Sequence, residues 1–150
     1  MRPGLRPVKE VSPLIVKDDS RKALNVLVVD DEPDVREIFR LALTRKGHEV
    51  TLAESGEAAV QRAAETAIDL AFVDIAMPGI DGVETLKRLR ALSPDLPVVM
   101  ITAFIDGGLT PDERQDRVTD ALNLGARGCL RKPFGVETIL KTVEYFGHGA

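Results

Sequence analysis

From residue 25 onward, short apolar runs alternate with longer stretches in which apolar side chains recur every three or four residues. Uninterrupted apolar runs are typical of strands buried on both faces of a parallel sheet, and the three-to-four spacing predicts amphipathic helices between them. The predicted strands lie at residues 26–29, 49–53, 70–73, 98–101 and 128–131. The predicted helices follow them at residues 33–47, 56–67, 83–92, 111–124 and 136–146.

Residues that begin and end helices fall where this alternation needs them. Pro33 suits the first turn of a helix that ends at Gly47. Thr110 and Glu113 form a predicted capping box around Pro111. Five strands, each followed by a helix, predict an α/β fold: a doubly wound, five-stranded parallel sheet with helices on both faces and right-handed crossovers.

The first 23 residues have a different character from the rest of the chain. They contain Pro3, Pro7 and Pro13 among mixed charges, without sustained periodicity. We therefore predict an N-terminal extension over residues 1–23, flexible or lying against the domain. A strand over residues 11–16 is the alternative, which Pro13 disfavours. Residues 24–147 are expected to form one domain, with no second domain in the chain.

Composition excludes several classes of function. The 150 residues are 44% hydrophobic and 29% charged, which is ordinary for a globular domain. A formal charge of −4 argues against a nucleic-acid surface in this chain. No apolar run approaches the roughly 20 residues of a membrane span. A single cysteine forms no internal disulfide, so a reducing compartment, the cytoplasm, is the expected location.

Polar residues gather where the predicted strands end. Asp30 and Asp31 follow the first strand, Asp74 the third, Thr102 the fourth and Lys132 the fifth. Ligands of open parallel sheets bind outside the carboxyl ends of the strands, so these residues form the candidate site. Three carboxylates raise one another's pKa unless a cation joins them, and Mg²⁺ with oxygen ligands meets that need.

This set of side chains suits phosphoryl transfer, which depends mainly on positioning and charge neutralisation. Asp74 is the natural nucleophile, because a carboxylate can carry phosphate as an acyl phosphate. The Thr102 hydroxyl and the Lys132 ammonium group can each contact a phosphoryl oxygen. The sequence has no G-x-x-x-x-G-K-[ST] loop, so it predicts a phosphate acceptor and not a nucleotide-binding protein.

The motifs together resemble those of the receiver domains of two-component response regulators, over about residues 24–146. The resemblance implies a flavodoxin-like strand order of 2-1-3-4-5. The matching segments are Val28-Val29-Asp30-Asp31-Glu32, Asp74 with Met77-Pro78-Gly79 and Asp81-Gly82, Ile101-Thr102-Ala103, and Lys132-Pro133-Phe134.

The resemblance also implies roles for individual residues. Asp74 would accept a phosphoryl group from a phosphohistidine on a sensor histidine kinase or a phosphotransfer protein, as part of a phosphorelay. Asp31, Asp74 and the backbone carbonyl of Ala76 would bind Mg²⁺ directly, and Asp30 directly or through water. A cis peptide bond is implied between Lys132 and Pro133, aiming the lysine inward.

The resemblance implies a signalling module and not an enzyme. Such a module has at most intrinsic self-phosphorylation and autodephosphorylation. The expected partners are the kinase and a downstream protein target, with homodimer formation on phosphorylation left open. No membrane or direct nucleic-acid partner is expected. A phosphatase working through an aspartyl phosphate is disfavoured, because Ala76 stands where such an enzyme needs an acid/base carboxylate.

Three features depart from the family pattern. Cys129 occupies the position of a switch Tyr or Phe, and we predict it to be a small core residue in a buried strand. The span from Thr102 to Lys132 is longer than usual, with an insertion predicted near Gly107-Gly108. Ala76 and Phe104 stand where side chains tune access of water to the phosphate, so an altered dephosphorylation rate is expected.

Several simpler interpretations remain beside this one. The chain could be a degenerate receiver that acts as a phosphate-independent interaction domain. Asp31 could serve only as the cap of the helix that begins at Pro33. His48 and His148 lack the spacing of metal ligands and are predicted to lie on the surface, and the charged residues 112–120 are predicted to be the solvated face of a helix.

Overall fold

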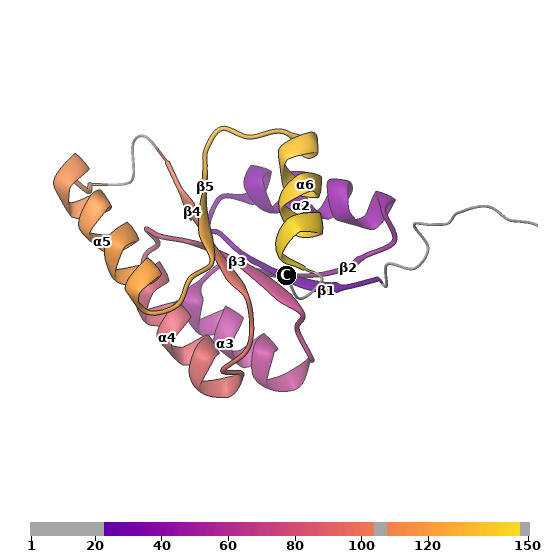
Figure 1. The fold of residues 1–150 in the computed structure, drawn as a ribbon, viewed down its shortest axis with the longest axis horizontal. Coiled ribbons are helices and arrows are strands. Elements are labelled where there is room, and N and C mark those ends of the chain that lie inside the picture. Colours follow the sequence, from indigo (N-terminus) through magenta and orange to yellow (C-terminus); the bar gives the residue numbers. More distant parts are fainter. Residues whose placement is uncertain (1–22, 104–107, 148–150) are drawn as a thin grey trace, which may run out of the picture.

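Residues 23–103 and 108–147 are described by the computed structural model, and they form a doubly wound α/β fold (Figure 1). All neighbouring strands are parallel, and the sheet has the order β2-β1-β3-β4-β5. Both the fold class and the strand order predicted from the sequence are therefore confirmed. The strands are β1 (Asn25–Val29), β2 (Glu49–Ala53), β3 (Leu70–Asp74), β4 (Val98–Thr102) and β5 (Gly128–Arg131).

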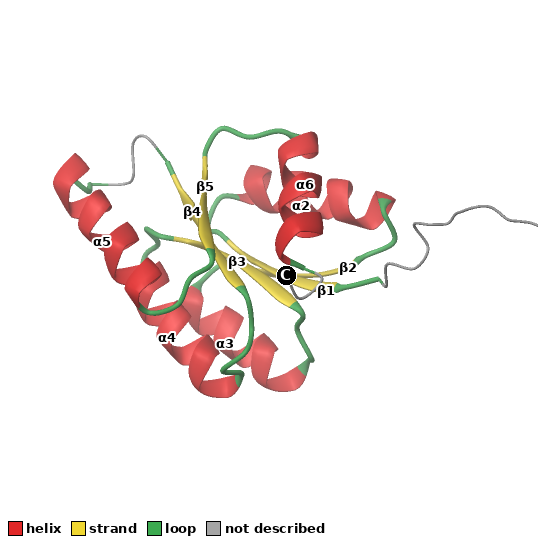
Figure 2. Ribbon diagram, in the orientation of Figure 1, coloured by secondary structure: helices red, strands yellow, loops and turns green. Residues whose placement is uncertain are grey.

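Each strand is followed by a helix, as predicted. The helices are α2 (Pro33–Arg45), α3 (Gly56–Glu65), α4 (Gly82–Leu92), α5 (Pro111–Asn123) and α6 (Val136–Phe146). Helices α2 and α6 cover one face of the sheet, and α3, α4 and α5 lie on the other (Figure 2). None of the helices in the described part of the chain combines the length and apolar character needed to cross a membrane.

The strand side chains alternate between two separate cores, as the period of two in a strand requires. Val26 and Val28 of β1 point into the core shared with Phe39 of α2 and Ile139 of α6. Leu27 and Val29 point into the opposite core, against α3 and α4. Strands β1, β3 and β4 are therefore buried on both faces, which explains their uninterrupted apolar runs.

Helix caps agree with the sequence in one case and contradict it in another. The predicted capping box is confirmed: Thr110 Oγ1 accepts the Glu113 N–H, and the Glu113 carboxylate accepts the Thr110 N–H. The interpretation of Asp31 as a cap of α2 is wrong. Glu32 is the N-cap residue there, and no side chain caps the helix. A role for Asp31 has to be sought outside helix capping.

Strand β5 lies at the sheet edge, and the prediction of Cys129 as a core residue is wrong. Cys129 is exposed, and only Leu130 of this strand is buried. Cys129 stands beside Met100 in the sheet, on the face of α3, α4 and α5. Helix α5 buries a single residue, Ala121, so it does not extend over this end of the face. Cys129 is exposed because no part of α5 covers this end of β5.

The remaining predictions concern His48, which the structure describes, and several residues that it does not describe. His48, predicted to lie on the surface, is half-buried, and its Nδ1 accepts the Leu24 N–H at 3.0 Å. The alternative strand at 11–16, together with Phe104, Gly107 and His148, lies outside the described residues. Gly108 is described and has a φ of 90°, a conformation that glycine adopts without strain.

Candidate functional site

Three carboxylates meet at the carboxyl end of β1 and β3, which are neighbours in the sheet. Asp30 and Asp31 follow the last residue of β1, and Asp74 is the last residue of β3. Each offers a carboxylate oxygen within 4.8 Å of those of the other two. Asp30 is fully buried and Asp74 is 3% exposed, whereas Asp31 is exposed. The structure thus brings together all three acids that the sequence singled out.

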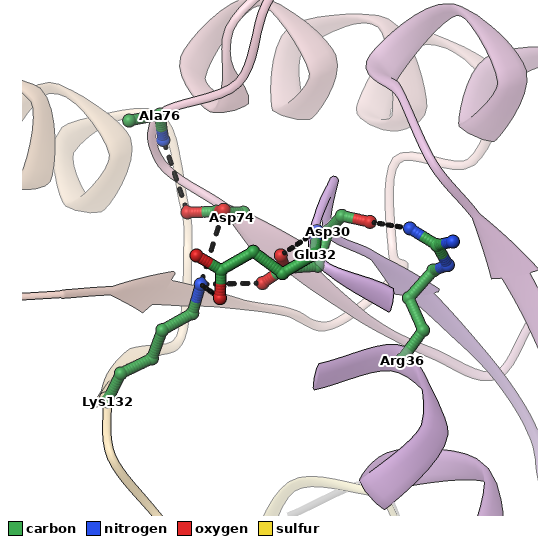
Figure 3. A network of polar contacts seen from close by, with 6 residues as sticks. All are labelled: Asp30, Glu32, Arg36, Asp74, Ala76 and Lys132. Carbon is green, nitrogen blue, oxygen red and sulfur yellow. Dashed lines mark hydrogen bonds and ion pairs between the residues drawn. The ribbon is translucent and has the colours of Figure 1, made fainter. Parts of the chain in front are cut away.

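Hydrogen bonds to its backbone and side chain hold the buried Asp30 in place (Figure 3). Its Oδ1 accepts the Glu32 N–H at 2.9 Å, and its carbonyl accepts a hydrogen bond from Arg36 at 2.8 Å. The Asp30 N–H donates to the carbonyl of Ala53 on β2. Asp74 has a looser tie, since its Oδ1 accepts the Ala76 N–H at 3.3 Å. The buried acid is rigidly placed, and Asp74 keeps an oxygen directed toward the cluster.

Lys132 reaches the same cluster from the end of β5, and the implied cis bond between Lys132 and Pro133 is present. Its Nζ lies 3.0 Å from Asp30 Oδ2 and 3.6 Å from Asp74 Oδ2. The Asp30 contact is an ion pair without the alignment of a hydrogen bond. Nζ also donates to Glu32 Oε1 at 3.2 Å. Glu32 thereby joins the site across a sequence separation of 100 residues.

The acids and the lysine change one another's protonation. Burial, followed by the charge of Asp30, raises the pKa of Asp74 from its ordinary 3.8 to about 7, against the lowering effect of Lys132. Burial likewise raises the pKa of Asp30. Burial acts to lower the pKa of Lys132, but the charges of Asp74 and Asp30 outweigh it, and the pKa of the ammonium group is raised. Lys132 is therefore a permanent cation here.

Thr102 ends β4 beside this cluster. It is 8% exposed, and its Oγ1 is buried without a hydrogen-bond partner among residues 23–103 and 108–147. Burying an unsatisfied hydroxyl is unfavourable, so such groups commonly belong to binding sites. Thr102 therefore remains a candidate donor to a ligand oxygen at the carboxyl edge of the sheet.

A pocket of about 430 Å³ opens over these strand ends. Asp30 and Thr102 are buried and do not form part of its lining. Arg117 of α5 lines it, although sequence reasoning assigned residues 112–120 to a solvated face. Arg117 stands four residues before Ala121, which the structure shows to be buried, so both residues lie on the inward side of α5. The full lining consists of Asp31, Glu32, Asp74, Ala76, Met77, Pro78, Ala103, Leu109, Arg117 and Lys132.

The donor set of the cluster fits Mg²⁺. This ion prefers hard oxygen ligands and commonly binds one or two carboxylates together with waters and phosphate. Three carboxylates within 4.8 Å of one another, two of them buried, provide such ligands. Burial raises the pKa of both Asp30 and Asp74, and at Asp74 the charge of Asp30 adds to the rise; a divalent cation would favour the ionised form of each.

The arrangement of the site matches one known class of protein. The family model for the response regulator receiver domain matches residues 26–144 of the chain. The chain belongs to this family of phosphoacceptor signalling domains of two-component systems. Receiver domains generally bind Mg²⁺ at an acidic pocket, in agreement with the cluster described above.

Individual relatives and structures agree with this assignment. The chain is 37% identical to the response regulator MprA of Mycolicibacterium vanbaalenii over 117 residues, which are 78% of this chain and 47% of that protein. It is 33% identical to the uncharacterized transcriptional regulatory protein YkoG of Bacillus subtilis, over 80% of this chain and 49% of that protein. The chain thus spans about half the length of these curated relatives.

Solved structures show the same fold. The chemotaxis protein CheY4 of Vibrio cholerae superposes with a TM-score of 0.71 at 31% identity, covering 83% of this chain and 99% of that one. NtrX of Brucella abortus gives a TM-score of 0.73 at 31% identity, covering 83% of this chain and 27% of that one. The receiver fold therefore occurs both nearly alone and as a part of a longer protein.

Proposed function

We propose that Asp74 accepts a phosphoryl group from the phosphohistidine of a sensor histidine kinase or a phosphotransfer protein, so that the domain acts in a phosphorelay. The observation that carries this proposal is the juxtaposition of Asp30, Asp31 and Asp74 with the ammonium group of Lys132. A buried acid cluster with one permanent cation repels other anions unless more positive charge enters. Mg²⁺ brings that positive charge, so the cluster suits a phosphoryl group that binds together with Mg²⁺.

The transfer step follows from the positions of the side chains. A carboxylate oxygen of Asp74 forms a bond to phosphorus, and the phosphorus–nitrogen bond of the phosphohistidine breaks. The electron pair of that bond returns to the imidazole nitrogen, and Asp74 becomes an acyl phosphate. Lys132 and the Thr102 hydroxyl each hold one phosphoryl oxygen, which places and neutralises the developing charge.

Asp31, Asp74 and the Ala76 backbone carbonyl are the proposed direct ligands of Mg²⁺, with Asp30 acting directly or through water. The exposed position of Asp31 and the place of Ala76 in the pocket wall support this division, because both stand on the solvent side of Asp30. When bound, Mg²⁺ supplies positive charge to the carboxylates and to the phosphoryl oxygens. Asp74 is then held in the ionised form that it needs as a nucleophile.

The signal is proposed to pass to a downstream protein target. Receiver domains act with histidine kinases and with output domains, and this chain covers only about half of relatives such as MprA. We take residues 24–147 as the receiver unit, in keeping with helices and strands that run from Asn25 to Phe146. Homodimer formation on phosphorylation is part of this proposal and is read out by comparing molar mass before and after labelling.

Intact mass measurement tests the phosphoacceptor role directly. The chain is incubated with Mg²⁺ and acetyl phosphate, and the Asp74→Asn variant is treated in parallel. One added phosphoryl group, dependent on Mg²⁺ and lost in the variant, is the expected result. If neither acetyl phosphate nor a panel of phosphorylated kinases adds a phosphoryl group, the domain is a phosphate-independent interaction module instead.

A further inference from the structure

Arg117 connects the pocket over Asp74 to helix α5. Its side chain lines the pocket together with Asp74 and Lys132. Its Nη1 donates to Asp81 Oδ2 at 2.8 Å, and both side chains are about one third exposed. The other oxygen of Asp81, Oδ1, caps α4 by accepting the Glu84 N–H. The guanidinium group therefore lies at the pocket wall, paired with an aspartate that also caps α4.

The lining of the pocket is short of positive charge. Lys132 and Arg117 are the two cations among the lining residues, and Lys132 already faces three carboxylates. The phosphorylated Asp74 side chain carries close to two negative charges at neutral pH, where the free carboxylate carries one. Arg117 is the remaining source of positive charge in the lining that is not committed to the acid cluster itself.

We propose that Arg117 is a second cationic contact of the phosphoryl group on Asp74, reached by exchanging its ion pair with Asp81 for phosphoryl oxygens. This inference rests on the proposed function of Asp74. Arginine suits the exchange, because its planar guanidinium group binds phosphate oxygens in a two-pronged manner and its long side chain can turn without moving the backbone. The partly exposed pair with Asp81 is weak enough to be replaced.

The exchange has a consequence for α5. This helix buries only Ala121, so few apolar contacts fix its position beside α4 (Figure 1). The pair between Arg117 and Asp81 is a tie between the two helices. When Arg117 binds the phosphoryl group, this ion pair is replaced by a contact to the end of β3. The position of α5 then depends on whether Asp74 is phosphorylated.

The test uses two substitutions with opposite expected signs. Arg117→Gln removes the charge while keeping the length of the side chain. Asp81→Asn weakens the ion pair but retains the cap of α4, since asparagine caps helices as well as aspartate does. The full chain is labelled with acetyl phosphate and Mg²⁺, and the rate of phosphoryl addition is followed by intact mass.

Arg117→Gln is expected to label about tenfold more slowly, the loss of one charge-assisted contact. Asp81→Asn is expected to label faster than the wild type, because Arg117 is released. A purely structural pair would make both substitutions act in the same direction, which overturns the inference. Arg88→Ala, which removes an exposed pair with Glu84 on α4, is the control and should label at the wild-type rate.

The two proposals fail in different ways. If the wild type is labelled and Arg117→Gln is labelled at the same rate, the role of Arg117 is overturned and the role of Asp74 is left intact. A wild-type chain that takes no phosphoryl group overturns both. If Arg117→Gln does not fold, Asp81→Asn decides alone: slower or unchanged labelling in that variant contradicts the exchange.

Discussion

Lys132 Nζ lies 3.0 Å from Oδ2 of Asp30, an aspartate whose side chain is completely buried. A buried carboxylate is costly to hold unless a cation compensates it, and this lysine comes from the opposite end of the chain. The pair joins the end of β5 to the end of β1 across β3 and β4. The contact that compensates the buried charge of Asp30 therefore also links the edge strand β5 to β1 near the centre of the sheet.

Replacing Lys132 with methionine is expected to destabilise the metal-free protein by about 3 kcal/mol at pH 8, because two buried carboxylates lose their cation. The loss should be smaller at pH 6. Asp74 can then take up a proton, since without Lys132 its pKa rises further above about 7. Urea denaturation in EDTA at both pH values measures the difference.

Lys141→Met is the matched control, since Lys141 forms only an exposed pair with Glu137 on α6. Exposed pairs of this kind contribute between nothing and about 1 kcal/mol. Equal effects of the two substitutions would contradict a stabilising role of Lys132 in the acid cluster.

The stability of the metal-free protein is expected to fall as the pH rises from 6 to 8. The folded state keeps the proton of Asp74 up to a pKa of about 7, whereas the unfolded chain releases it near 3.8. The folded state therefore binds more protons between these values, and raising the pH removes stability, by about 1 kcal/mol over this window. Thermal unfolding in EDTA gives the measurement.

Magnesium should reverse this trend, because it binds the ionised carboxylates. The gain in Tm on adding Mg²⁺ is expected to be larger at pH 8 than at pH 6. Asp74→Asn removes the titrating group and should flatten the pH dependence in EDTA. A metal-free wild type that becomes more stable between pH 6 and pH 8 would show that the pKa of Asp74 is not raised.

Thr102→Val is expected to separate stability from function. Removing a buried hydroxyl without a partner in the described structure should raise the free energy of unfolding by about 1 kcal/mol. The same substitution should slow the labelling of Asp74 by acetyl phosphate, because a phosphoryl oxygen loses a donor. Urea denaturation and intact mass measure the two effects.

Thr85→Val provides the matched control for this experiment. Thr85 is also buried, but its hydroxyl donates to the Asp81 carbonyl at 2.7 Å. The substitution should cost about 1 kcal/mol and leave labelling unchanged. Faster or unaltered labelling in Thr102→Val would argue that the Thr102 hydroxyl does not contact the phosphoryl group.

The sequence predicted those features that depend on local pattern. The apolar runs of β1, β3 and β4 are buried on both faces, and the polar residues that follow them, such as Asp30 and Asp74, do meet at one edge. Both results need only the period of a strand and the parallel arrangement of the sheet. The capping box at Thr110 is equally local.

Features that depend on contacts between distant elements were missed. The exposure of Cys129 follows from where α5 lies over the sheet, and the place of Arg117 follows from its contact with Asp81, 36 residues earlier in the chain. Glu32 enters the site through Lys132, which is 100 residues away. No periodicity or motif encodes these distances, because they arise from the packing of whole helices.

Gly82 illustrates the same point and carries the last prediction. The predicted helix at residues 83–92 left Gly82 outside, but α4 begins at this residue. A Cβ here would lie 2.2 Å from the backbone oxygen of Asp74 and 2.7 Å from the Cα of Ile75. These are backbone atoms at the end of a buried strand, so moving them aside is energetically costly. Gly82→Ala is expected to cost about 3 kcal/mol in the free energy of unfolding, measured by urea denaturation.

The substitution should also slow the labelling of Asp74, the proposed phosphoacceptor, because its own backbone oxygen is among the displaced atoms. Gly135→Ala is the control: a Cβ there meets nothing within 4 Å, and the loss of glycine at the N-cap of α6 should cost at most about 1 kcal/mol. If Gly82→Ala were as stable as Gly135→Ala and labelled at the wild-type rate, the start of α4 would be able to move away from β3. The close contact between that helix and Asp74 would then not be what fixes the phosphoacceptor in place.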